Sequence, residues 1–551
     1  MRTHAQETLW DQTNRSLSSS FLWTMTETGD QKRTGAVPLA VDDSPDYLEW
    51  DLVNGTHPDG YDDNDDDKDV FDRCCVPKTM AWLSFYVKET KQLRIAVVEG
   101  YNVANASPPI LMIASDTIPL EAIRAIQAGH RVTLSVTTTR EGAALSVLHR
   151  LRRQQQTNRN HYSFSDLGLE PYSTTTTTSA YPDAVALSPI HMHCSLEAFV
   201  PLSSSSSSSS TTNKDNQQQQ QDQKGDHPSP CATAEMLLLL KVDNWLLKGE
   251  ILSRPPTPPE GGREVLALVD AAKIRPVCSL GWKDGFCTIR QTHAMLRPRQ
   301  VDNLEDVAQG WTSDAFVVKT RIDDKEQQEQ AEFADYVYDP SDAESTQRFG
   351  YNPCKAIVMP RPIGWISTFP TTSATEGDER IGHVAPFSFF AQLSKTDTPL
   401  VAFSSYRTEQ GTRKKDAQLD VETTGCFCVN MVSERNAVAM NMTSSSVGRR
   451  GDEFVVGDIQ MDRTDPTTTG IDAPFVQDTP VLLQCRYTQT VDVASFSIVV
   501  GRVERIRIDS RFINTNDNDD DKPFLDIARM KPVTRLGYTD EYAVVDEMIA
   551  P

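Results

Sequence analysis

The sequence lacks the short motifs that mark several large classes of enzyme and metal protein. Its ten cysteines include no C-x-x-C pair and no zinc-finger spacing, and a chain of 551 residues is too large to need disulfides as staples. This cysteine usage favours a reducing compartment. No G-x-G-x-x-G, P-loop or G-x-S-x-G pattern occurs, so a separate Rossmann domain for a nicotinamide cofactor is not supported.

Positive charge and long apolar runs are also scarce. The formal net charge is -23 and the pI is near 4.9, which argues against nucleic acid as a partner, because a phosphate backbone is bound by clustered Lys and Arg. The most apolar run, Met236 to Leu247, is interrupted by Lys241, Asp243 and Asn244. It is too short and too polar to span a bilayer. We therefore expect a soluble, cytoplasmic protein with no membrane partner.

An internal repeat is the strongest positive signal. The segment Val269 to Ile289 aligns without gaps with Leu525 to Val545, and self-similarity of this kind indicates a duplicated structural unit. Three further pairs of segments match in the same order: Val76 to Tyr86 with Met359 to Phe369, Pro108 to Ser115 with Thr398 to Ser405, and ILSR ending at Arg254 with IDSR ending at Arg511. The first of these pairs places Trp82 opposite Trp365, and a core aromatic is expected at each position.

Strand patterns dominate both copies of the repeat. Residues 426–431 alternate between apolar and polar positions, and residues 132–137 do so more weakly. Other stretches of strand length are rich in β-branched residues. Many short strands with few helices favour a closed barrel or a sandwich over a parallel α/β sheet, so the expected class is mainly β.

Two helices are predicted at matching places in the copies. In the second copy, Asp416 can N-cap a helix that runs to about Thr424, with Gly425 in the left-handed C-terminal position. In the first copy, Pro119 starts a helix that ends at Gly129. Each helix precedes an alternating strand, as expected for two versions of one unit.

These patterns divide the chain into two units of moderate size. We expect a disordered N-terminal segment over residues 1–39, a first unit over 40–300, a linker over 301–345 and a second unit over 346–551. Low-complexity insertions interrupt the first unit near 152–181 and 203–231, and they are expected to be disordered loops between strands. Within the linker, residues 316–322 have a strand-like pattern.

Several sequence blocks stand in one order in the second unit: MPRPIGWIST from Met359, HVAPFSFF from His383, KKDAQLDVETTGCFCVN from Lys414, GDEF from Gly451, and an ending with RLG and Tyr542. With these blocks, residues 345 to 551 resemble the flavin reductase-like, or flavoredoxin-like, family of FMN-binding split barrels. The resemblance implies a six-stranded antiparallel Greek-key barrel that dimerises, with FMN near the subunit interface and NADH or NADPH as reductant. Two tandem barrels would then form an internal pseudo-dimer with one flavin site in the cleft between them.

A flavin phosphate needs several converging donors, and the start of the expected helix in the second unit can supply them. Backbone N–H groups, the helix dipole and the charge of Lys415 would act together there. Ser367 and Thr368 could add hydroxyl donors, and Arg413 or Lys414 a second cation. The alternative is that these basic residues are solvated cations beside the helix.

The HVAPFSFF block supplies the other predicted flavin contacts. By the resemblance, Ala385, Pro386, Phe387 and Ser388 lie along the isoalloxazine ring as an apolar wall; a buried strand is the alternative. His383 would tune the flavin or hydrogen-bond a loop. No catalytic residue and no metal ligand is nominated. The full predicted cofactor-binding set is Arg361, Ser367, Thr368, His383, Ala385, Pro386, Phe387, Ser388, Arg413, Lys415 and Asp416.

Three positions of the second unit depart from the family pattern. His383 stands where Asn is usual, Ala417 where Thr usually follows Lys-Asp, and Asp420 where Asn is common. Ala417 removes a hydroxyl donor that would face the phosphate, and Asp420 places a carboxylate within a turn of it. These changes lower the FMN affinity that the resemblance implies.

The first unit departs much further from the family pattern. Pro119 and Leu120 stand opposite Lys415 and Asp416, Phe85 replaces Thr368, and roughly IAVVEG (95–100) stands opposite APFSFF. Strand alternation and turns persist, whereas a phosphate site cannot lose its charge and donors cheaply. We expect the first unit to keep the fold and to have lost the site.

Two clusters of metal-binding residue types lie in the first unit. His191, His193 and Cys194 occupy a strand-like stretch in which alternate side chains share a face, so the two histidines could chelate an ion. No further ligand is evident, and we do not expect a metal there. The adjacent Cys74 and Cys75 are expected to be buried and inert.

The expected function is that of a flavoprotein oxidoreductase, which accepts a hydride from NADH or NADPH on FMN. It would pass electrons to an acceptor such as free flavin, ferric iron, a quinone or a partner oxygenase. Without a Rossmann domain, the nicotinamide would dock on the flavin itself. The alternative is a non-catalytic scaffold, flavin-binding or flavin-free, whose inserts recruit partners. Flavin and nicotinamide nucleotides are the expected ligands, and the pseudo-dimer could self-associate further.

Overall fold

A computed structural model describes most of both units. The described residues are 47–53, 66–153, 161–173, 181–202, 235–254, 267–280, 285–289, 291–295, 317–321, 333–349, 353–370, 380–394, 399–408, 412–449, 451–514, 524–538, 541–545 and 548–549. The expected disordered segment 1–39 and the insert 203–231 lie outside these residues. Among the residues described, no helix is long and apolar enough to cross a membrane.

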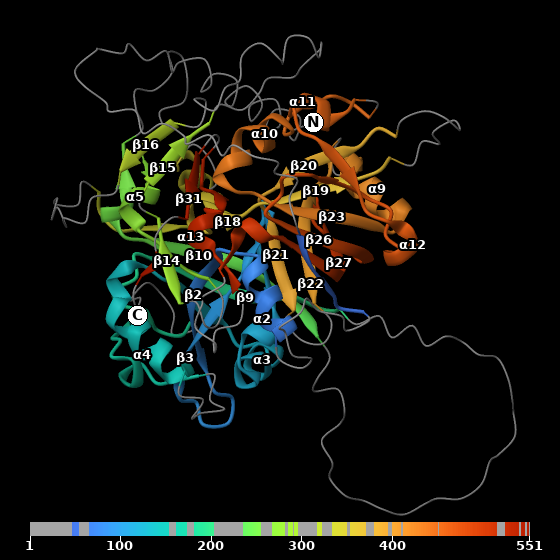
Figure 1. Cartoon of the computed structure of the whole chain (residues 1–551). Coiled ribbons are helices and arrows are strands. Elements are labelled where there is room, and N and C mark those ends of the chain that lie inside the picture. Colours follow the sequence, from blue (N-terminus) through green and yellow to red (C-terminus); the bar gives the residue numbers. More distant parts are fainter. Residues whose placement is uncertain are drawn as a thin grey trace, which may run out of the picture.

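The first unit is built mainly of antiparallel strands, and Figure 1 shows it in blue to green. Its main strands are β2 (Lys78–Tyr86), β3 (Leu93–Glu99), β4 (Asn102–Ala106), β5 (Pro109–Ala114), β6 (Val132–Val136), β9 (Ile190–Pro201) and β10 (Met236–Leu247). Its helices are α2 (Asp66–Cys74), α3 (Leu120–Gln127), α4 (Gly142–Arg153) and α5 (Ala271–Ile274). Short strands complete it: β7 (Pro171–Tyr172), β8 (Ala184–Val185), β11 (Leu252–Ser253), β12 (Leu268–Val269), β13 (Val277–Ser279), β14 (Phe286–Thr288) and β15 (Gln291–Ala294).

The second unit repeats this plan and appears in yellow to red in Figure 1. Its main strands are β19 (Gly364–Thr368), β20 (His383–Phe387), β21 (Phe390–Ser394), β22 (Leu400–Tyr406), β23 (Cys426–Met431), β26 (Val481–Val493) and β27 (Phe496–Asp509). Its helices are α6 (Ala343–Phe349), α7 (Cys354–Ile357), α9 (Asp416–Thr424), α10 (Ala437–Met442), α11 (Glu453–Val456), α12 (Pro466–Thr469) and α13 (Ile527–Met530). Its short strands are β18 (Arg361–Pro362), β24 (Met461–Arg463), β25 (Pro474–Val476), β28 (Ile513–Asn514), β29 (Phe524–Leu525), β30 (Val533–Arg535), β31 (Glu541–Val544) and β32 (Met548–Ile549).

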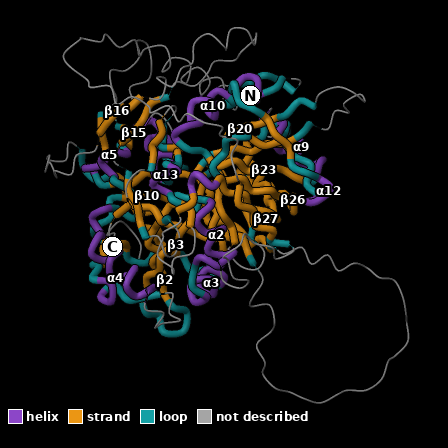
Figure 2. The backbone as a smooth tube through the Cα atoms, viewed as in Figure 1, coloured by secondary structure: helices purple, strands orange, loops and turns teal. Residues whose placement is uncertain are grey.

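The two units have the same strand order, which confirms the duplication. Hydrogen-bonded neighbours follow β3-β2-β6-β9-β10-β5-β4 in the first unit and β20-β19-β23-β26-β27-β22-β21 in the second. Figure 2 shows the helices around the outside of this mainly β body. The paired tryptophans of the repeat, Trp82 and Trp365, are both fully buried, as expected. The fold is therefore a tandem pair of antiparallel split barrels.

Register shows how closely the sequence repeat follows the structure. Ser279 pairs with Phe286 on β13 and β14, and Arg535 pairs with Tyr542 at the same point of β30 and β31. The match of ILSR with IDSR is wrong. Asp270 N–H donates to the carbonyl of Ile251, whereas the equivalent Asp526 N–H donates to that of Phe512. Ile251 therefore corresponds to Phe512. The ILSR and IDSR segments resemble each other by chance and lie a few residues out of register.

Helices α3 and α9 lie where the sequence predicts them, each before an alternating strand. Gly129 and Gly425 follow them with φ values of +81° and +75°, the left-handed region that favours glycine at a helix C-terminus. The prediction that Asp416 is the N-cap of α9 is wrong by one residue. Lys415 is the N-cap, with extended dihedrals, and Asp416 is the first helical residue.

A strand that precedes the main sheet of each unit pairs with the other unit. Strand β1 (Tyr47–Asp51) lies near the start of the first unit and pairs with β27 of the second. Strand β17 (Tyr336–Tyr338) lies within the expected linker, precedes the second unit and pairs with β10 of the first. The strand expected at 316–322 forms as β16 (Val317–Arg321), which pairs with β15. This reciprocal exchange ties the two units together.

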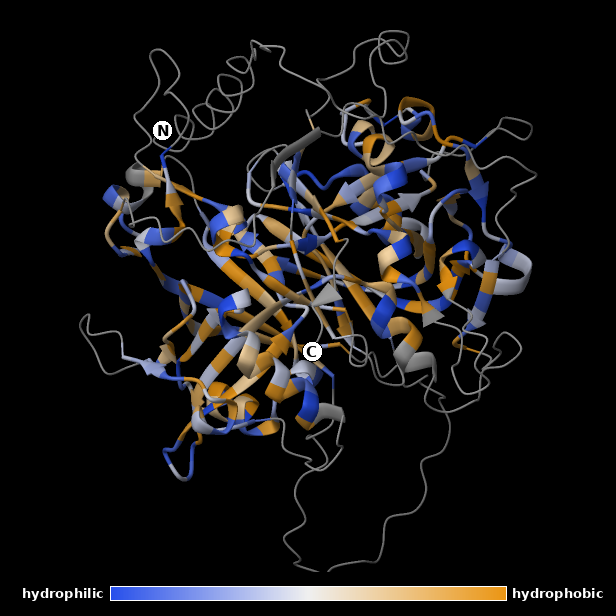
Figure 3. Cartoon of the chain, turned by 60° about the vertical axis from the view of Figure 1, so that its left-hand side comes forward, coloured by the Kyte–Doolittle hydropathy of each residue, from blue (hydrophilic) through white to orange (hydrophobic). Residues whose placement is uncertain are grey.

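An apolar interface between the units strengthens that connection. Residues of β4, β5 and β10, including Met112 and Leu239, form one buried cluster with residues of β21, β22 and β27, including Leu393 and Val500. Figure 3 shows the ribbon of the strands in the middle of the molecule mostly in orange, the colour of hydrophobic residues. The two barrels therefore pack as an internal pseudo-dimer, because neither could bury these strand faces alone.

One expected insert is partly folded. Residues 161–173, inside the stretch expected to be disordered, place Phe164, Leu167 and Leu169 in a buried cluster with Trp82 and α4. The backbone of Tyr162 also exchanges hydrogen bonds of 2.8 and 2.9 Å with Ile95 of β3. Apolar residues spaced among polar ones give this segment enough buried surface to order it.

Candidate functional site

Strand β20 presents a partly open surface in a region that is otherwise core. Its register with β19 sets Trp365 against Pro386 and Thr368 against His383. Ala385, Pro386 and the following Ser388 are half-buried, whereas Phe387 points inward and packs on Phe403 with ring centroids 4.7 Å apart. This segment, 385–388, is the predicted flavin wall, and it is accessible from one side.

The start of helix α9 lies beside this wall. The ammonium nitrogen of Lys415 is 5.7 Å from the ring centre of Phe387. The side chain of the N-cap residue, Lys415, makes no capping hydrogen bond to the first turn of α9, and the leading N–H groups of a helix are suited to binding an anion. Lys415 and Arg413 are exposed. The structure therefore brings together the two regions that the sequence predicts to hold the two ends of a flavin.

A buried polar cluster lies on the other side of α9, centred on Asp420. This carboxylate is fully buried. Its Oδ2 atom accepts a hydrogen bond from His383 Nδ1 at 2.8 Å and a longer one from Thr368 Oγ1 at 3.4 Å. The second ring nitrogen of His383 lies 3.2 Å from the carbonyl oxygen of Arg449. Because both partners of the ring are acceptors, both nitrogens donate, and the imidazole carries a positive charge.

The pKa values in this cluster agree with that assignment. Burial lowers the pKa of His383, but the hydrogen bond to Asp420 and the nearby charges of Glu453, Asp420 and Asp416 raise it above its usual value overall. Burial raises the pKa of Glu453 to about 7, against the opposing effect of His383 and of a hydrogen bond from the N–H of Val384. The cluster therefore holds protons near neutral pH.

Arg449 completes the cluster, and sequence reasoning did not find it. Its guanidinium bonds both to Asp420 and to Asp416, the latter at 3.1 Å. Arg449 lies outside the sequence blocks, in a loop just before GDEF, so no pattern identified it. His383 and Asp420, two departures from the family pattern, contact each other. His383 and Arg449 together balance the carboxylates of Asp416 and Asp420 near the helix start.

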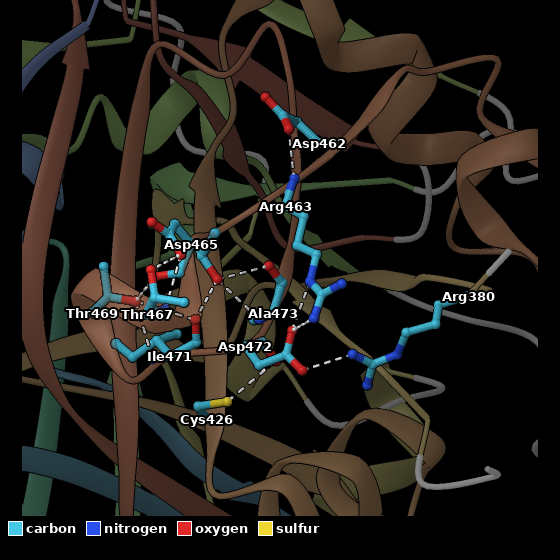
Figure 4. A network of polar contacts seen from close by, with 11 residues as sticks. Arg380, Cys426, Asp462, Arg463, Asp465, Thr467, Thr469, Ile471, Asp472 and Ala473 are labelled. Atoms are coloured by element: carbon cyan, nitrogen blue, oxygen red, sulfur yellow. Dashed lines mark hydrogen bonds and ion pairs between the residues drawn. The ribbon is translucent and has the colours of Figure 1, made fainter. Parts of the chain in front are cut away.

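Ser367, a predicted phosphate donor, has internal partners. Its hydroxyl donates to the carbonyl of Pro474 at 2.6 Å and accepts from the side-chain amide of Asn430 at 2.9 Å. The hairpin of β24 and β25 that carries Pro474 is held by a further polar network. Figure 4 shows Asp472 between Arg380 and Arg463, which bond to it at 2.6 and 2.9 Å. This arrangement favours a structural role for Ser367.

Arg361, another predicted site residue, is almost completely buried. Its guanidinium donates to the backbone carbonyls of Lys355, Val358 and Leu536. Burial, together with the charge of Arg535, lowers the pKa of Arg361 to about 9. These contacts join the strand β18 to α7 and to the end of the chain, and they too favour a structural role.

Comparison with known proteins places the second unit in one family. Residues 357–528 match the model of the flavin reductase like domain. An uncharacterised protein of Deinococcus radiodurans is 30% identical over 192 residues, which cover 35% of this chain and 79% of that protein. An uncharacterised protein of Aquifex aeolicus is 28% identical over 181 residues, which cover 33% of this chain and 83% of that protein. The chain belongs to the flavin reductase-like family of FMN-binding split barrels.

Solved structures of the same kind are similar to part of this flavin reductase-like chain. Nitrilotriacetate monooxygenase component B of Bacillus cereus is 19% identical, with a TM-score of 0.30, and the match covers 36% of this chain and 90% of that one. The 2-nitrobenzoate 2-nitroreductase of Pseudomonas fluorescens is 22% identical, with a TM-score of 0.29, and the match covers 36% of this chain and 86% of that one. The flavoredoxin of Desulfovibrio vulgaris is 17% identical, with a TM-score of 0.29, covering 35% and 90%.

In the first unit of this flavin reductase-like protein, the residues that correspond to the predicted flavin wall are buried. Trp82 pairs with Val97 as Trp365 pairs with Pro386. The counterpart of APFSFF is therefore AVVEGY (96–101), one residue later than the sequence match suggests. Its wall positions, 96–99, are all buried, and Tyr162 covers the adjacent edge of β3. Pro119 is the N-cap of α3, as Lys415 is of α9.

The histidines and cysteines of the first unit lie in the core. Burial lowers the pKa of His191 to about 3 and also lowers that of His193. Their Nδ1 atoms contact Ser135 and Asn244 at 3.1 and 2.8 Å. Within the described part of the chain, no group of three His, Cys, Asp or Glu residues is placed to hold a metal ion. Cys74 and Cys75 are buried, and burial raises their thiol pKa values, which makes them unreactive, as expected.

Proposed function

We propose that the second unit binds FMN noncovalently, with the isoalloxazine along residues 385–388 and the phosphate at the start of α9. The protein then acts as an oxidoreductase that takes a hydride from NADH or NADPH. It passes electrons to an acceptor such as free flavin, ferric iron, a quinone or a partner oxygenase. The observation that carries this proposal is the contact between Lys415 and Phe387, which joins a cationic helix start to a half-open apolar wall.

The residues at these two places fit the chemistry of FMN. An anion at the start of α9 meets the first backbone N–H groups of the helix, the positive end of the helix dipole and the charges of Lys415 and Arg413. A planar aromatic ring meets Ala385 and Pro386, which offer apolar surface without long side chains in the way. The protein therefore offers one surface suited to the phosphate and another suited to the ring, and the contact of Lys415 with Phe387 joins them.

Charge balance supports the proposal despite the extra carboxylate. Asp420 lies within the first two turns of α9, where a free negative charge would repel a phosphate. Its partners are the imidazolium of His383 and the guanidinium of Arg449, and Arg449 also bonds to Asp416. Two cations thus offset two carboxylates. Lys415 and Arg413 are exposed and add further positive charge beside the start of α9.

The residues have separate roles in this proposal. When bound, FMN supplies the two-electron redox chemistry. The wall 385–388 orients the ring and excludes water from one face of it, and the start of α9 fixes the phosphate. His383 holds a proton between Asp420 and the carbonyl of Arg449, and it orders the loop that carries Arg449. No side-chain acid or base is assigned to the hydride step.

The proposal is tested on the purified full-length chain. We expect FMN to bind and give the visible spectrum of a protein-bound flavin, and we expect NADH or NADPH to bleach that spectrum without oxygen. A chain that leaves added FMN free in solution overturns the proposal. A chain that binds FMN but is not bleached by either nucleotide supports the flavin site and refutes nicotinamide as the reductant.

A further inference from the structure

The turn at the end of the flavin wall is held from the other unit. Asn102 is the first residue of β4, in the first unit, and it is buried. Its side-chain amide donates to the carbonyl of Phe390 at 2.7 Å and to that of Ser388 at 3.3 Å. Its side-chain oxygen accepts from the N–H of Val103 at 2.7 Å. The amide therefore bridges two carbonyls of the turn between β20 and β21.

The residue between those carbonyls also belongs to the first unit's core. Phe389 is buried in the apolar cluster that includes Leu83, Tyr101 and Val103 of the first unit. Its own carbonyl accepts from the N–H of Ser404 at 2.8 Å. The turn that ends the wall is thus fixed by a side chain in an apolar pocket and by an amide across the unit boundary.

This contact is one-sided. Asn102 pairs with Met112, and at the matching point of the second unit Ala391 pairs with Ala402. Alanine has no side-chain donor, so the second unit cannot return the contact to the equivalent turn of the first. The asymmetry is the reverse of that at the helix starts, where the second unit has Lys415 and the first has Pro119.

We propose that Asn102 of the first unit is a positioning residue for the flavin wall of the second, so that the unit without a phosphate site completes the site of its neighbour. This inference rests on the proposed binding of FMN. By fixing the directions of the Ser388 and Phe390 carbonyls, the amide sets the orientation of Ser388 and the end of the wall. Small displacements of such a surface weaken a contact with a rigid planar ring, because ring and wall must match over their whole area.

The experiment compares two asparagines of the same strand. Asn102→Leu removes both donors with little change in volume. Asn105→Leu is the matched control, since Asn105 is equally buried in β4 and also contacts the second unit, at Ser495 (3.2 Å), but its amide donates to Pro108 of its own unit, at 2.7 Å, and not to the wall. For each variant, FMN titration gives Kd, the visible spectrum at saturation reports the surroundings of the ring, and thermal unfolding reports stability.

We expect Asn102→Leu to raise the Kd of FMN about tenfold, because a displaced wall loses part of its contact with the ring, and to shift the spectrum of the bound flavin. Asn105→Leu should lower stability by a similar amount while leaving Kd and the spectrum as in the wild type. Asn102→Gln, which keeps the donor, should recover part of the affinity.

Each other outcome has a separate meaning. If the wild-type chain does not bind FMN, the proposed function fails and this inference fails with it. If the wild type binds FMN and Asn102→Leu binds it equally well with the same spectrum, the positioning role is refuted and the proposed function stands. Equal weakening by the two leucine variants also refutes it, because general damage to β4 would then explain the loss.

Discussion

At the start of α9 the second unit carries Lys415 and Asp416, whereas the start of α3 in the first unit carries Pro119 and Leu120. The strands on either side of these helices keep the same order and pairing. Divergence has therefore changed the residues at the helix starts and has spared the order and pairing of the strands. This is the expected result when barrel packing constrains nearly every strand residue and ligand binding constrains only a few.

The comparison also shows that the first unit is more than a remnant. It contributes Asn102 to the wall of the second unit, and β17, next to the second unit in sequence, pairs with its β10. The second unit in turn pairs its β27 with β1. Deleting the first unit should therefore expose the apolar interface and remove a contact of the flavin wall at the same time.

The largest expected effect is a loss of stability when Asp420 is replaced, compared with the replacement of Arg124 at the matching position of the first unit. Asp420→Ala leaves the imidazolium of His383 and the guanidinium of Arg449 without their buried partner, and we expect a loss of about 3 kcal/mol in unfolding free energy. Arg124 stands at the matching position of α3 and is exposed, so Arg124→Ala should change stability by less than about 0.5 kcal/mol. Urea unfolding measures both, and similar losses would show that the cluster is not special.

The next effect is a pH dependence of stability that arises in both units. Burial raises the pKa of Glu453 to about 7 in the second unit, and burial likewise raises that of Glu141 to about 7 in the first. For a folded-state pKa above the unfolded value, the stabilisation is complete below about pH 4.5 and is lost as the pH rises through 7. His383 contributes with the same sign, losing its stabilisation above its unfolded pKa.

Replacing these glutamates distinguishes the two contributions. We expect each of Glu453→Gln and Glu141→Gln to remove about 2 kcal/mol of the decline in unfolding free energy between pH 5 and pH 8. The double variant should remove most of it. Unfolding curves at the two pH values provide the measurement, and an unchanged decline in the double variant would contradict the assignment.

Ligand binding should respond to the helix start of one unit alone. Lys415→Ala removes a charge that we place at the phosphate, so the Kd of FMN should rise about tenfold. Pro119→Ala, at the equivalent N-cap of α3, should leave Kd unchanged. Titration followed by flavin fluorescence measures both variants. Normal binding by Lys415→Ala would place the phosphate elsewhere.

The smallest expected effect is equal in the two units. Gly129 and Gly425 end the matched helices with φ values of +81° and +75°, and a methyl group at either position would meet no other atom within 4 Å. Alanine there is disfavoured by backbone conformation alone, at about 1 kcal/mol. Thermal unfolding of Gly129→Ala and Gly425→Ala should give similar losses. A much larger loss in one unit would reveal packing that the repeat does not share.

The sequence predicted features that depend on short spacing along the chain. Alternation over a few residues indicated strands such as β23, and Gly425 marked the end of α9. The repeat matched Ser279 with Arg535 and Phe286 with Tyr542, and in each copy these two positions pair with each other in the same register. The start of α9 was predicted one residue late, because an aspartate is a good N-cap on its own whereas here the chain enters the helix at Lys415.

What the sequence determined by itself was therefore the mainly β class, the duplication and the different residues at the two helix starts. Local periodicity and residue identity are enough for these, because they follow from which side chains alternate and which charges are present. Only the tertiary structure decided that His383 contacts Asp420, that Arg449 joins them, and that Asn102 reaches across to Ser388. Those contacts join residues far apart in the chain, and their formation depends on how the two barrels pack, which no short pattern records.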